Sequence, residues 1–300
     1  MKAVVGVMSA VLVGLFVCVP VSASAGGADT EAYIEQMQQW RQARHDRLSD
    51  PDGWMTLVGM EWLEEGENSV GSSGSSDARI PGGPESWGTI YLEGDDIRFV
   101  PTPGNGITVN DEIVEEAMLI ADVQGKPTVV RSGDLSFYVI FRESYALRVK
   151  DRKAPNLLAF KEMPAYGIEP SWRIEGQLAR AEEGAVIEIA NVLGQVSETP
   201  LYGTFEFERD GEKYSLLALG TEESSYLWFI FADKTSGRET YGAGRFLYSD
   251  GMPANGKLVV DFNKAYNPPC AYNDYSTCSL PPQQNRLKLA VRAGEKKYHD

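Results

Sequence analysis

Short apolar runs, separated by clusters of turn residues, recur along the chain from Trp54 to Val291 and limit the folds open to it. The runs are rich in Val, Ile, Tyr and Phe, and most are too short for a buried helix, so they are typical of strands. Gly, Asp and Asn fill the breaks between the runs, and these residues favour tight turns. The pattern predicts an all-β fold with one N-terminal helix, built as two consecutive β-sandwich or barrel-like parts.

The expected strands fall into two groups. Those of the first part span residues 54–63, 89–92, 97–100, 107–109, 117–123, 128–131, 135–141 and 145–149. Those of the second part span residues 186–192, 203–208, 214–219, 225–232, 244–248, 258–262 and 287–291. Residues 151–175 contain three prolines, and we expect this stretch to be irregular and to join the two parts. Arg209–Glu212 and Thr235–Gly237 are typical of hairpin tips.

One segment with helical periodicity precedes the strands. We expect Thr30 to cap this helix and Pro51–Gly53 to end it. Four apolar residues fall near one face of this helix: Tyr33, Met37, Trp40 and Leu48. We therefore expect four regions in the chain. They are a signal peptide at 1–25, a leader and helix at 26–53, a β-sandwich at 54–150 and a C-terminal β domain with a disulfide loop at 151–300.

Residues 1–25 have the features of a secretory signal peptide. Lys2 supplies a positive start, residues 3–21 are an almost unbroken apolar run, and Ala23–Ala25 supplies the small-residue cleavage pattern. Cleavage after Ala25 predicts a periplasmic or extracellular protein with no stable membrane insertion. A retained transmembrane anchor is the alternative interpretation of the same run.

Cleavage would remove Cys18 and leave Cys270 and Cys278 as the two remaining cysteines. In an oxidising compartment such a pair is expected to form a disulfide. A catalytic thiol and a pair of metal ligands are the alternatives. The seven residues between Cys270 and Cys278 do not match the short Cys-x-x-Cys spacing of a zinc site, so no metal is expected here.

The charge balance excludes some classes of partner and reaction. Lys and Arg total 28 against 43 Asp and Glu, and this formal charge of -15 disfavours binding to nucleic acids. His45 and His299 are the only histidines, which disfavours Ser-His-Asp catalysis and multi-His metal sites. No phosphate-binding loop of the Gly-x-x-x-x-Gly-Lys-Ser/Thr kind is present, and no cofactor is expected.

The C-terminal half carries the more specific motifs. They are Phe231–Gly237, Glu239–Tyr241, Gly244–Leu247, Asp261–Tyr272, Cys278–Pro282, Asn285–Leu287 and Ala293–Lys296, with Gly53–Trp54, Leu57–Gly59 and Glu61–Leu63 upstream. These motifs resemble the bacterial and archaeal family known as domain of unknown function 1684, over nearly the whole mature chain. Ser279 departs from the family pattern, which usually has Pro after the second Cys. The resemblance implies no activity, because the family has no agreed one.

Part of the first half resembles the forkhead-associated β-sandwich that binds phosphothreonine. The resemblance follows the order of strands and turns at Val70–Gly71, Asp77–Pro81, Gly88–Leu92 and Gly106–Asn110. The phosphate-binding residues of that module are missing, because its Gly-Arg is Gly71–Ser72 here and its Ser-Arg-x-His is Ser86–Gly88. Without the Arg there is no charge-assisted fork for a phosphate, so the resemblance implies a scaffold and not phosphopeptide binding.

Polar and aromatic side chains gather where the expected strand 258–262 runs into a Pro-Pro loop, a place where binding groups are often presented. We expect this loop to fold back against the hairpin that ends at Tyr248. The pocket so formed would bind a small polar ligand or a glycan. Its candidate ligand-binding residues are Tyr241, Arg245, Asp261, Asn263, Tyr266, Asn267 and Tyr272.

Three other interpretations use the same segments. A carboxylate-dependent hydrolase would pair Asp233 or Glu239 with Asp261 as candidate catalytic residues. A purely structural envelope protein would use Asp261–Cys278 as a clasp, with Arg245 as the counter-ion of Asp233 or Asp261. A calcium site would place oxygens of Asp233, Thr235 and Glu239 around Gly237, although the spacing is not that of the helix-loop-helix motif.

Overall fold

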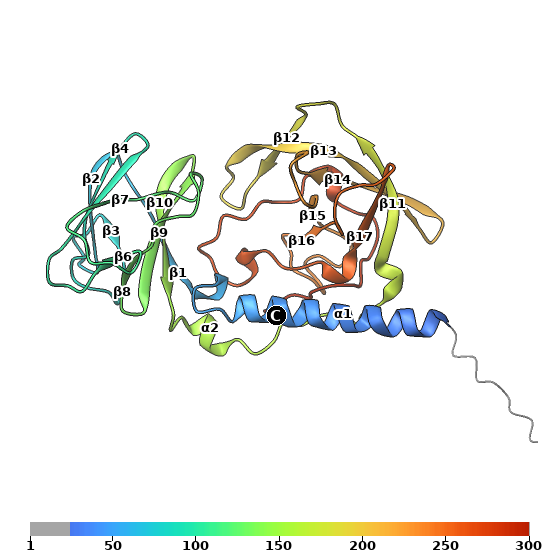
Figure 1. Ribbon diagram of the computed structural model, residues 1–300, viewed down its shortest axis with the longest axis horizontal. Coiled ribbons are helices and arrows are strands. Elements are labelled where there is room, and N and C mark those ends of the chain that lie inside the picture. The colour runs from blue at the N-terminus through green and yellow to red at the C-terminus, as the bar shows by residue number, and fades with distance from the viewer. Residues whose placement is uncertain (1–24, 300) are drawn as a thin grey trace, which may run out of the picture.

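A computed structural model describes residues 25–299 (Figure 1). The predicted signal peptide, apart from Ala25, lies outside these residues. Within the described part of the chain, no helix combines the length and the apolar character that a membrane crossing requires. Strands dominate the remainder, and they form two parts that lie side by side, with one long helix along the second (Figure 1). The predicted fold class is confirmed.

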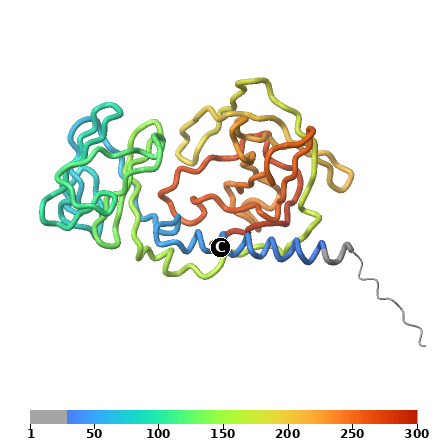
Figure 2. Tube along the Cα trace, in the orientation of Figure 1, coloured from blue at the N-terminus to red at the C-terminus, as the bar shows by residue number. Residues whose placement is uncertain are grey.

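Helix α1 (Ala25–Leu48) is the predicted N-terminal helix. It begins at Ala25 and not after Thr30, so the predicted cap was wrong, and it ends before the turn at Pro51 as expected. Met37 and Leu48 are buried, each 1% exposed. A short helical turn, η1 (Trp54–Thr56), then leads into the first strand. The helix lies along one side of the second part, and the C-terminal segment returns to it (Figure 2).

The first part holds two five-stranded sheets that enclose one core. One sheet has the order β1-β10-β9-β8-β6 and the other β3-β2-β4-β5-β7. Their bounds are β1 Leu57–Trp62, β2 Gly66–Gly71, β3 Ala78–Arg79, β4 Gly88–Glu93, β5 Asp96–Pro101, β6 Thr108–Val109, β7 Ala117–Met118, β8 Val130–Ser132, β9 Leu135–Arg142 and β10 Ser144–Asp151. Trp87, Phe99 and Phe137 fill the centre with no exposed surface. Phe99 and Phe137 do so because alternate residues of β5 and β9 face inward, and Trp87 directly precedes β4.

The second part is a curved sheet with the order β16-β15-β14-β13-β11-β17, to which β12 adds by pairing with β13. Its strands are β11 Arg173–Arg180, β12 Val186–Ala190, β13 Val196–Arg209, β14 Glu212–Leu219, β15 Trp228–Phe231, β16 Arg245–Tyr248 and β17 Lys257–Asp261. The two end strands approach each other through a bridge between Ser249 and Val260. Phe205, Phe229 and Phe262 lie fully buried in its core.

Several sequence predictions need correction. Residues 287–291 are not a strand. Leu287 and Leu289 form single backbone bonds to Ala232 and Lys234, whereas the Val291 N–H donates to the Asp233 side chain and its carbonyl accepts from Arg245. The predicted junction 151–175 is not wholly irregular, since it contains α2 (Pro155–Ala159), a turn η2 (Pro170–Trp172) and the start of β11. The predicted strand 117–123 is limited to Ala117–Met118, and the list of predicted strands lacks β2, β3 and β11.

The predicted turns and the disulfide occur in the structure. Arg209 pairs with Glu212 across a two-residue turn in which Asp210 and Gly211 both have positive φ, as tight hairpins require. Cys270 and Cys278 are bonded, with their Cα atoms 6.1 Å apart. Their loop follows the turns η3 (Phe262–Lys264) and η4 (Pro269–Ala271) and faces the first part of the molecule.

Candidate functional site

Segments that are distant in the sequence meet at β16. Phe246 and Tyr266 exchange two backbone hydrogen bonds of 2.8 and 2.9 Å, which anchors the stretch after Val260 against the β15–β16 hairpin. The hydroxyl of Tyr241, just before β16, donates to the carbonyl of Cys270 at 3.0 Å. The predicted site residues therefore lie in neighbouring segments, and three hydrogen-bonded networks divide them.

The first network surrounds Arg245, whose side chain is 1% exposed. Its guanidinium donates to the carbonyls of Val291, Ala293 and Glu295 at 2.9, 2.5 and 3.2 Å, and it lies 3.5 Å from Asp233. Burial lowers the pKa of Arg245, and the charge of Asp233 opposes that effect. Arg245 is thus a buried cross-link between β16 and the C-terminal segment, and its counter-ion is Asp233 and not Asp261.

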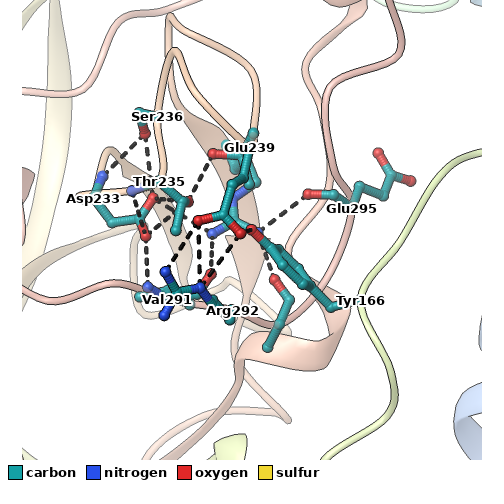
Figure 3. Close-up of polar contacts among 11 residues, drawn as sticks. Tyr166, Asp233, Thr235, Ser236, Glu239, Val291, Arg292 and Glu295 are labelled. Atoms are coloured by element: carbon teal, nitrogen blue, oxygen red, sulfur yellow. Dashed lines mark hydrogen bonds and ion pairs between the residues drawn. The ribbon is translucent and has the colours of Figure 1, made fainter.

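Asp233 is saturated by bonds from the protein (Figure 3). Its carboxylate accepts from the Val291 N–H at 2.6 Å, from the Thr235 hydroxyl at 2.9 Å and from the Ser236 hydroxyl at 3.2 Å. The side chain has no exposed surface. A carboxylate held in this way orders the β15–β16 loop, because each of its acceptor sites already has a donor.

Glu239 lies at the outer edge of the same network (Figure 3). It accepts a hydrogen bond of 3.0 Å from the Tyr166 hydroxyl and pairs with Arg292 at 3.2 Å. The bond from Arg292, followed by that from Tyr166, lowers the pKa of Glu239. Burial and the bond to Glu239 raise the pKa of Tyr166 to about 12. The candidate carboxylates Asp233 and Glu239 therefore share one network, and both are already paired with arginines of the protein.

Asp261 belongs to a second network, which α1 covers. The Tyr33 hydroxyl lies 2.9 and 3.1 Å from the two carboxylate oxygens of Asp261. Asn263 donates to Tyr33 at 2.8 Å and accepts from the Glu169 N–H at 3.0 Å. Asp261 and Asn263 are 0% and 1% exposed. Burial, together with the charge of Asp261, raises the pKa of Tyr33 well above its ordinary value. No ligand-binding oxygen of Asp261 is left open.

The third network joins α1 to the last residues of the chain. Arg44 pairs with Glu295 at 2.9 Å and donates to the Tyr272 hydroxyl at 2.8 Å and the Asn267 carbonyl at 3.1 Å. Glu295 also accepts from the Asn267 N–H at 2.6 Å. Arg44 lies over the ring of Tyr266, 4.8 Å from its centroid. Burial, the largest single effect, would lower the pKa of Arg44, but the charge and hydrogen bond of Glu295 together with Tyr272 and Tyr266 outweigh it, and the pKa is raised.

Sequence reasoning missed Tyr33, Arg44, Tyr166 and Glu295. A signal for the first two does exist, because Tyr33, Met37, Arg44 and Leu48 follow the three- and four-residue spacing of one helix face. No local pattern in the sequence shows that Tyr33 contacts Asp261 or that Arg44 contacts Glu295. As for the calcium interpretation, no group of three or more acidic, His or Cys residues within 25–299 is placed to hold a metal ion. Thr235 bonds to Asp233 instead.

An open groove of about 630 Å³ lies beside the disulfide loop. It is lined by Asn156, Tyr241, Cys270, Ala271, Tyr272, Asn273, Asp274, Tyr275, Lys297, Tyr298 and His299. Two of the predicted ligand-binding residues, Tyr241 and Tyr272, are therefore part of it, whereas Arg245, Asp261 and Asn267 are not. The rings of Tyr272 and Tyr298 lie 5.5 Å apart, and Tyr275 is 38% exposed. We call this the tyrosine groove.

Asn263 lines a different groove, of about 520 Å³, between α1 and residues 162–165 and 294–296. The arginines that face it are engaged: Arg41 donates to the Tyr166 carbonyl at 2.7 Å, and Arg44 is held by Glu295. The side-chain amide of Asn263 already donates to the Tyr33 hydroxyl and to the Glu169 carbonyl. This groove offers fewer aromatic faces than the tyrosine groove.

The comparisons with known proteins agree with the motifs in the sequence. Residues 158–296 match the family described as Protein of unknown function (DUF1684), and this range includes every site residue predicted from the sequence. An uncharacterised protein of Haloarcula marismortui, solved by NMR, is 32% identical over 46% of this chain and 77% of its own, with a TM-score of 0.39. No curated protein matches significantly.

Two solved forkhead-associated domains are similar to a smaller share of the chain. One is the domain of FhaA in complex with the intracellular domain of Rv3910, and the other comes from work on phosphothreonine-dependent interactions of such domains. Each is 22% identical and covers 32% of this chain and 96% of its own, with TM-scores of 0.23 and 0.22. Over residues 158–296 the chain matches the model of the DUF1684 family of proteins of unknown function, the family that the motifs in the sequence resemble.

Proposed function

We propose that the protein binds a small polar ligand, with a glycan as the favoured class, in the tyrosine groove. One observation carries this proposal: four tyrosines from three separate segments converge on a single open groove, namely Tyr241, Tyr272, Tyr275 and Tyr298. Phenol rings offer flat apolar faces for the C–H surface of a sugar. The Tyr241 and Tyr272 hydroxyls are already bonded within the protein, so the exposed Tyr275 is the phenol best placed to hydrogen-bond a ligand. The volume is in the usual range of ligand sites, about 300–1,000 Å³.

The walls of the groove are held in place before any ligand arrives. Asn156 donates to the Tyr272 carbonyl at 2.6 Å, and Asn273 donates to the Trp54 carbonyl at 3.1 Å. The disulfide closes the loop that carries Tyr272 and Tyr275. Such preorganisation favours binding, because little side-chain and loop entropy is lost when the ligand enters.

The polar groups at the rim suit an uncharged or weakly charged ligand. Asp274 and Lys297 contribute opposite charges to the lining, so neither sign dominates the groove. Asp274 and Tyr275 are exposed, and both can exchange water for ligand hydroxyls at small cost. A sugar presents donors and acceptors on its hydroxyls and an apolar face on its ring, which matches this mixture.

We do not extend the proposal to hydrolysis. A pair of catalytic carboxylates needs one member with a raised pKa next to an ionised partner, and both must face the substrate. Asp233 and Asp261 are buried in separate networks, and Glu239 has its pKa lowered by Arg292. The structural-clasp interpretation accounts for these three carboxylates, and it is compatible with ligand binding a short distance away.

We also propose that the protein works in the periplasm or outside the cell. The apolar run at residues 3–21 and the Cys270–Cys278 disulfide support this location, because disulfides persist in oxidising compartments. Mass spectrometry of the protein from its host would test it, and a mature chain that begins at Gly26 is the expected result.

Binding would be tested on an array of neutral and acidic oligosaccharides, followed by calorimetry with each ligand that binds. We expect Tyr275→Ala and Tyr298→Ala to weaken binding about tenfold each, which corresponds to about 1.4 kcal/mol. Tyr226→Ala is the matched control, because Tyr226 is 52% exposed and does not line the groove. Equal affinity of the groove variants and the control, or the absence of any bound oligosaccharide, would reject the proposal.

A further inference from the structure

A buried arginine without an acidic partner lies where the two parts of the molecule meet. Arg148 is in β10 of the first part, and it is 2% exposed. Across residues 25–299, no carboxylate lies within the 4.0 Å ion-pair distance of its guanidinium. Its Nε is buried and has no hydrogen-bond partner. Because arginine keeps its charge in proteins, this is a buried cation without a counter-ion.

The contacts of Arg148 are neutral and long. Its Nη1 atom lies 3.4 Å from the Tyr138 hydroxyl, and its Nη2 atom lies 3.3 Å from the Thr277 hydroxyl. Both distances exceed the usual range of about 2.7–3.2 Å for N–H···O bonds. The rings of Trp54 and Tyr138 flank the guanidinium at 5.3 and 5.9 Å. Arg245 is equally buried and its Nε likewise has no hydrogen-bond partner, but three carbonyls and Asp233 surround the rest of its guanidinium.

A second cation lies on the same face of β10. Lys150 follows two residues later, and its ammonium is 5.4 Å from the centroid of the Tyr138 ring. It donates to the backbone carbonyl of Asp52, and within the described chain it forms no ion pair. Burial lowers the pKa of Lys150; Asp52 opposes this effect and Arg148 adds to it. The two cations therefore repel each other at a partly desolvated position.

A third cation has the partner that these two lack. Arg142 pairs with Asp122 at 2.8 Å and also donates to the Thr277 hydroxyl at 3.0 Å. One neutral hydroxyl on the disulfide loop thus accepts from two guanidinium groups. The protein as a whole carries a formal charge of -15, so a shortage of carboxylates does not explain the unpaired Arg148.

An unpaired buried charge is strongly unfavourable, and chains keep such groups mainly where a function needs them. The guanidinium fork matches the two oxygens of a carboxylate or phosphate, and the match is strongest in a desolvated place. We propose that Arg148 and Lys150 bind an oxyanion at this seam, in the place where the Thr277 hydroxyl is now the acceptor. We call this the seam site.

An oxyanion would reach the seam site past side chains that are partly exposed to solvent. Tyr138, Lys150 and Thr277 are partly exposed, and Trp54 is 38% exposed. Displacing the Thr277 hydroxyl breaks only its contacts with Arg142 and Arg148. None of these side chains lines the tyrosine groove, so the seam site is separate from the proposed glycan site.

Thermal unfolding and calorimetry of the whole mature chain would test the proposal. The probes are inorganic phosphate and acetate at millimolar concentration, each compared with chloride at equal ionic strength. We expect one of the two anions to raise the Tm of the unmodified protein by several degrees, because a ligand that binds only the folded state stabilises it. A larger effect of phosphate would indicate a phosphorylated ligand, and a larger effect of acetate a carboxylate.

Arg148→Met is the decisive variant. In chloride it should unfold at the same or a higher Tm, because it removes an unpaired buried charge, and its response to the oxyanion should vanish. Lys213→Met is the control, since Lys213 is an exposed cation on β14 and should keep the full response. Lys150→Met should weaken the response, and it decides the question if Arg148→Met does not fold.

Two outcomes would overturn the seam site. One is the absence of any oxyanion effect on the unmodified protein beyond that of chloride. The other is an unchanged response in Arg148→Met or, if that variant is unfolded, in Lys150→Met. Glycan binding is measured separately, so failure of the seam site leaves the tyrosine-groove result untouched.

Discussion

The guanidinium of Arg245 and the carboxylate of Asp233 lie 3.5 Å apart, with side-chain exposures of 1% and 0%. Removing one partner leaves the other charge buried and uncompensated, which typically costs about 3–5 kcal/mol. We expect Arg245→Met to lower the free energy of unfolding by about this amount, as measured by urea denaturation. The carbonyls of Val291, Ala293 and Glu295 would also lose their donors.

Arg173→Met is the matched control for that change. Arg173 pairs with Asp250 at 3.0 Å, but its side chain is 46% exposed, and exposed pairs contribute about 0–1 kcal/mol. Arg245→Lys should remain strongly destabilising, because an ammonium cannot span three carbonyls and a carboxylate. A loss below about 1 kcal/mol for Arg245→Met would show that the buried pair does not hold the C-terminal segment.

Tyr33 ties α1 to the second part of the molecule through Asp261. Tyr33→Phe removes the hydroxyl and leaves the Asp261 carboxylate with fewer donors, so we expect a loss of about 1.5–3 kcal/mol in the free energy of unfolding. Limited proteolysis should cut α1 sooner in this variant. Tyr226→Phe, at an exposed phenol, should be neutral, and equal effects of the two substitutions would contradict the assignment.

Gly294 stands where the C-terminal segment passes Ala265. Its φ is +78°, and an added Cβ would come within 2.4 Å of the Ala265 carbonyl oxygen. Gly211 provides the matched control, because its φ is +80° and nothing lies within 4 Å of an added Cβ. Substitution by Ala at either site forces a left-handed conformation that costs about 1–2 kcal/mol.

We therefore expect Gly294→Ala to lose at least about twice as much stability as Gly211→Ala, since only the former also meets backbone atoms that cannot move freely. Urea denaturation of both variants would measure the difference. Equal losses would mean that the close approach of Gly294 to Ala265 is not needed for the fold.

Stability should fall in alkali because several phenols have raised pKa values. Burial and the bond to Glu239 raise the pKa of Tyr166 to about 12, from an ordinary value of 10.0. Between these values the folded state holds a proton that the unfolded state has lost, so the stabilising effect is complete below pH 10 and disappears as the pH rises through about 12. Tyr33, Tyr266 and Tyr272 act in the same direction.

Denaturation between about pH 9 and pH 12, with phenolate absorbance recorded in parallel, would check this dependence. Tyr166→Phe should flatten the decline, because one titrating group is removed. Tyr226→Phe should leave it unchanged, since Tyr226 is exposed and outside these networks. A decline of equal steepness in all three proteins would assign the effect to other groups.

Local sequence information was sufficient where a pattern repeats along the backbone. Alternation of apolar residues located most strands, and Asp210–Gly211 identified a hairpin tip, because the side-chain period of a strand and the φ demand of a turn act within a few residues. The same reasoning failed at Leu287–Val291, which is apolar like a strand but bonds to Arg245 and Asp233. No local property of the sequence distinguishes an apolar run that forms a strand from one, such as Leu287–Val291, that does not.

The all-β class, the N-terminal helix, the Cys270–Cys278 bond and the family match could be predicted from the residues alone, since each depends on residue types at short spacing. Which polar groups are free to act depends instead on how distant segments pack. Tyr33 reaches Asp261 across 228 positions and Arg44 reaches Glu295 across 251, and both carboxylates are buried, at 0% and 4% exposure. Burial and pairing arise when distant segments pack together, so the tyrosine groove and the unpaired Arg148 emerge only in the folded chain.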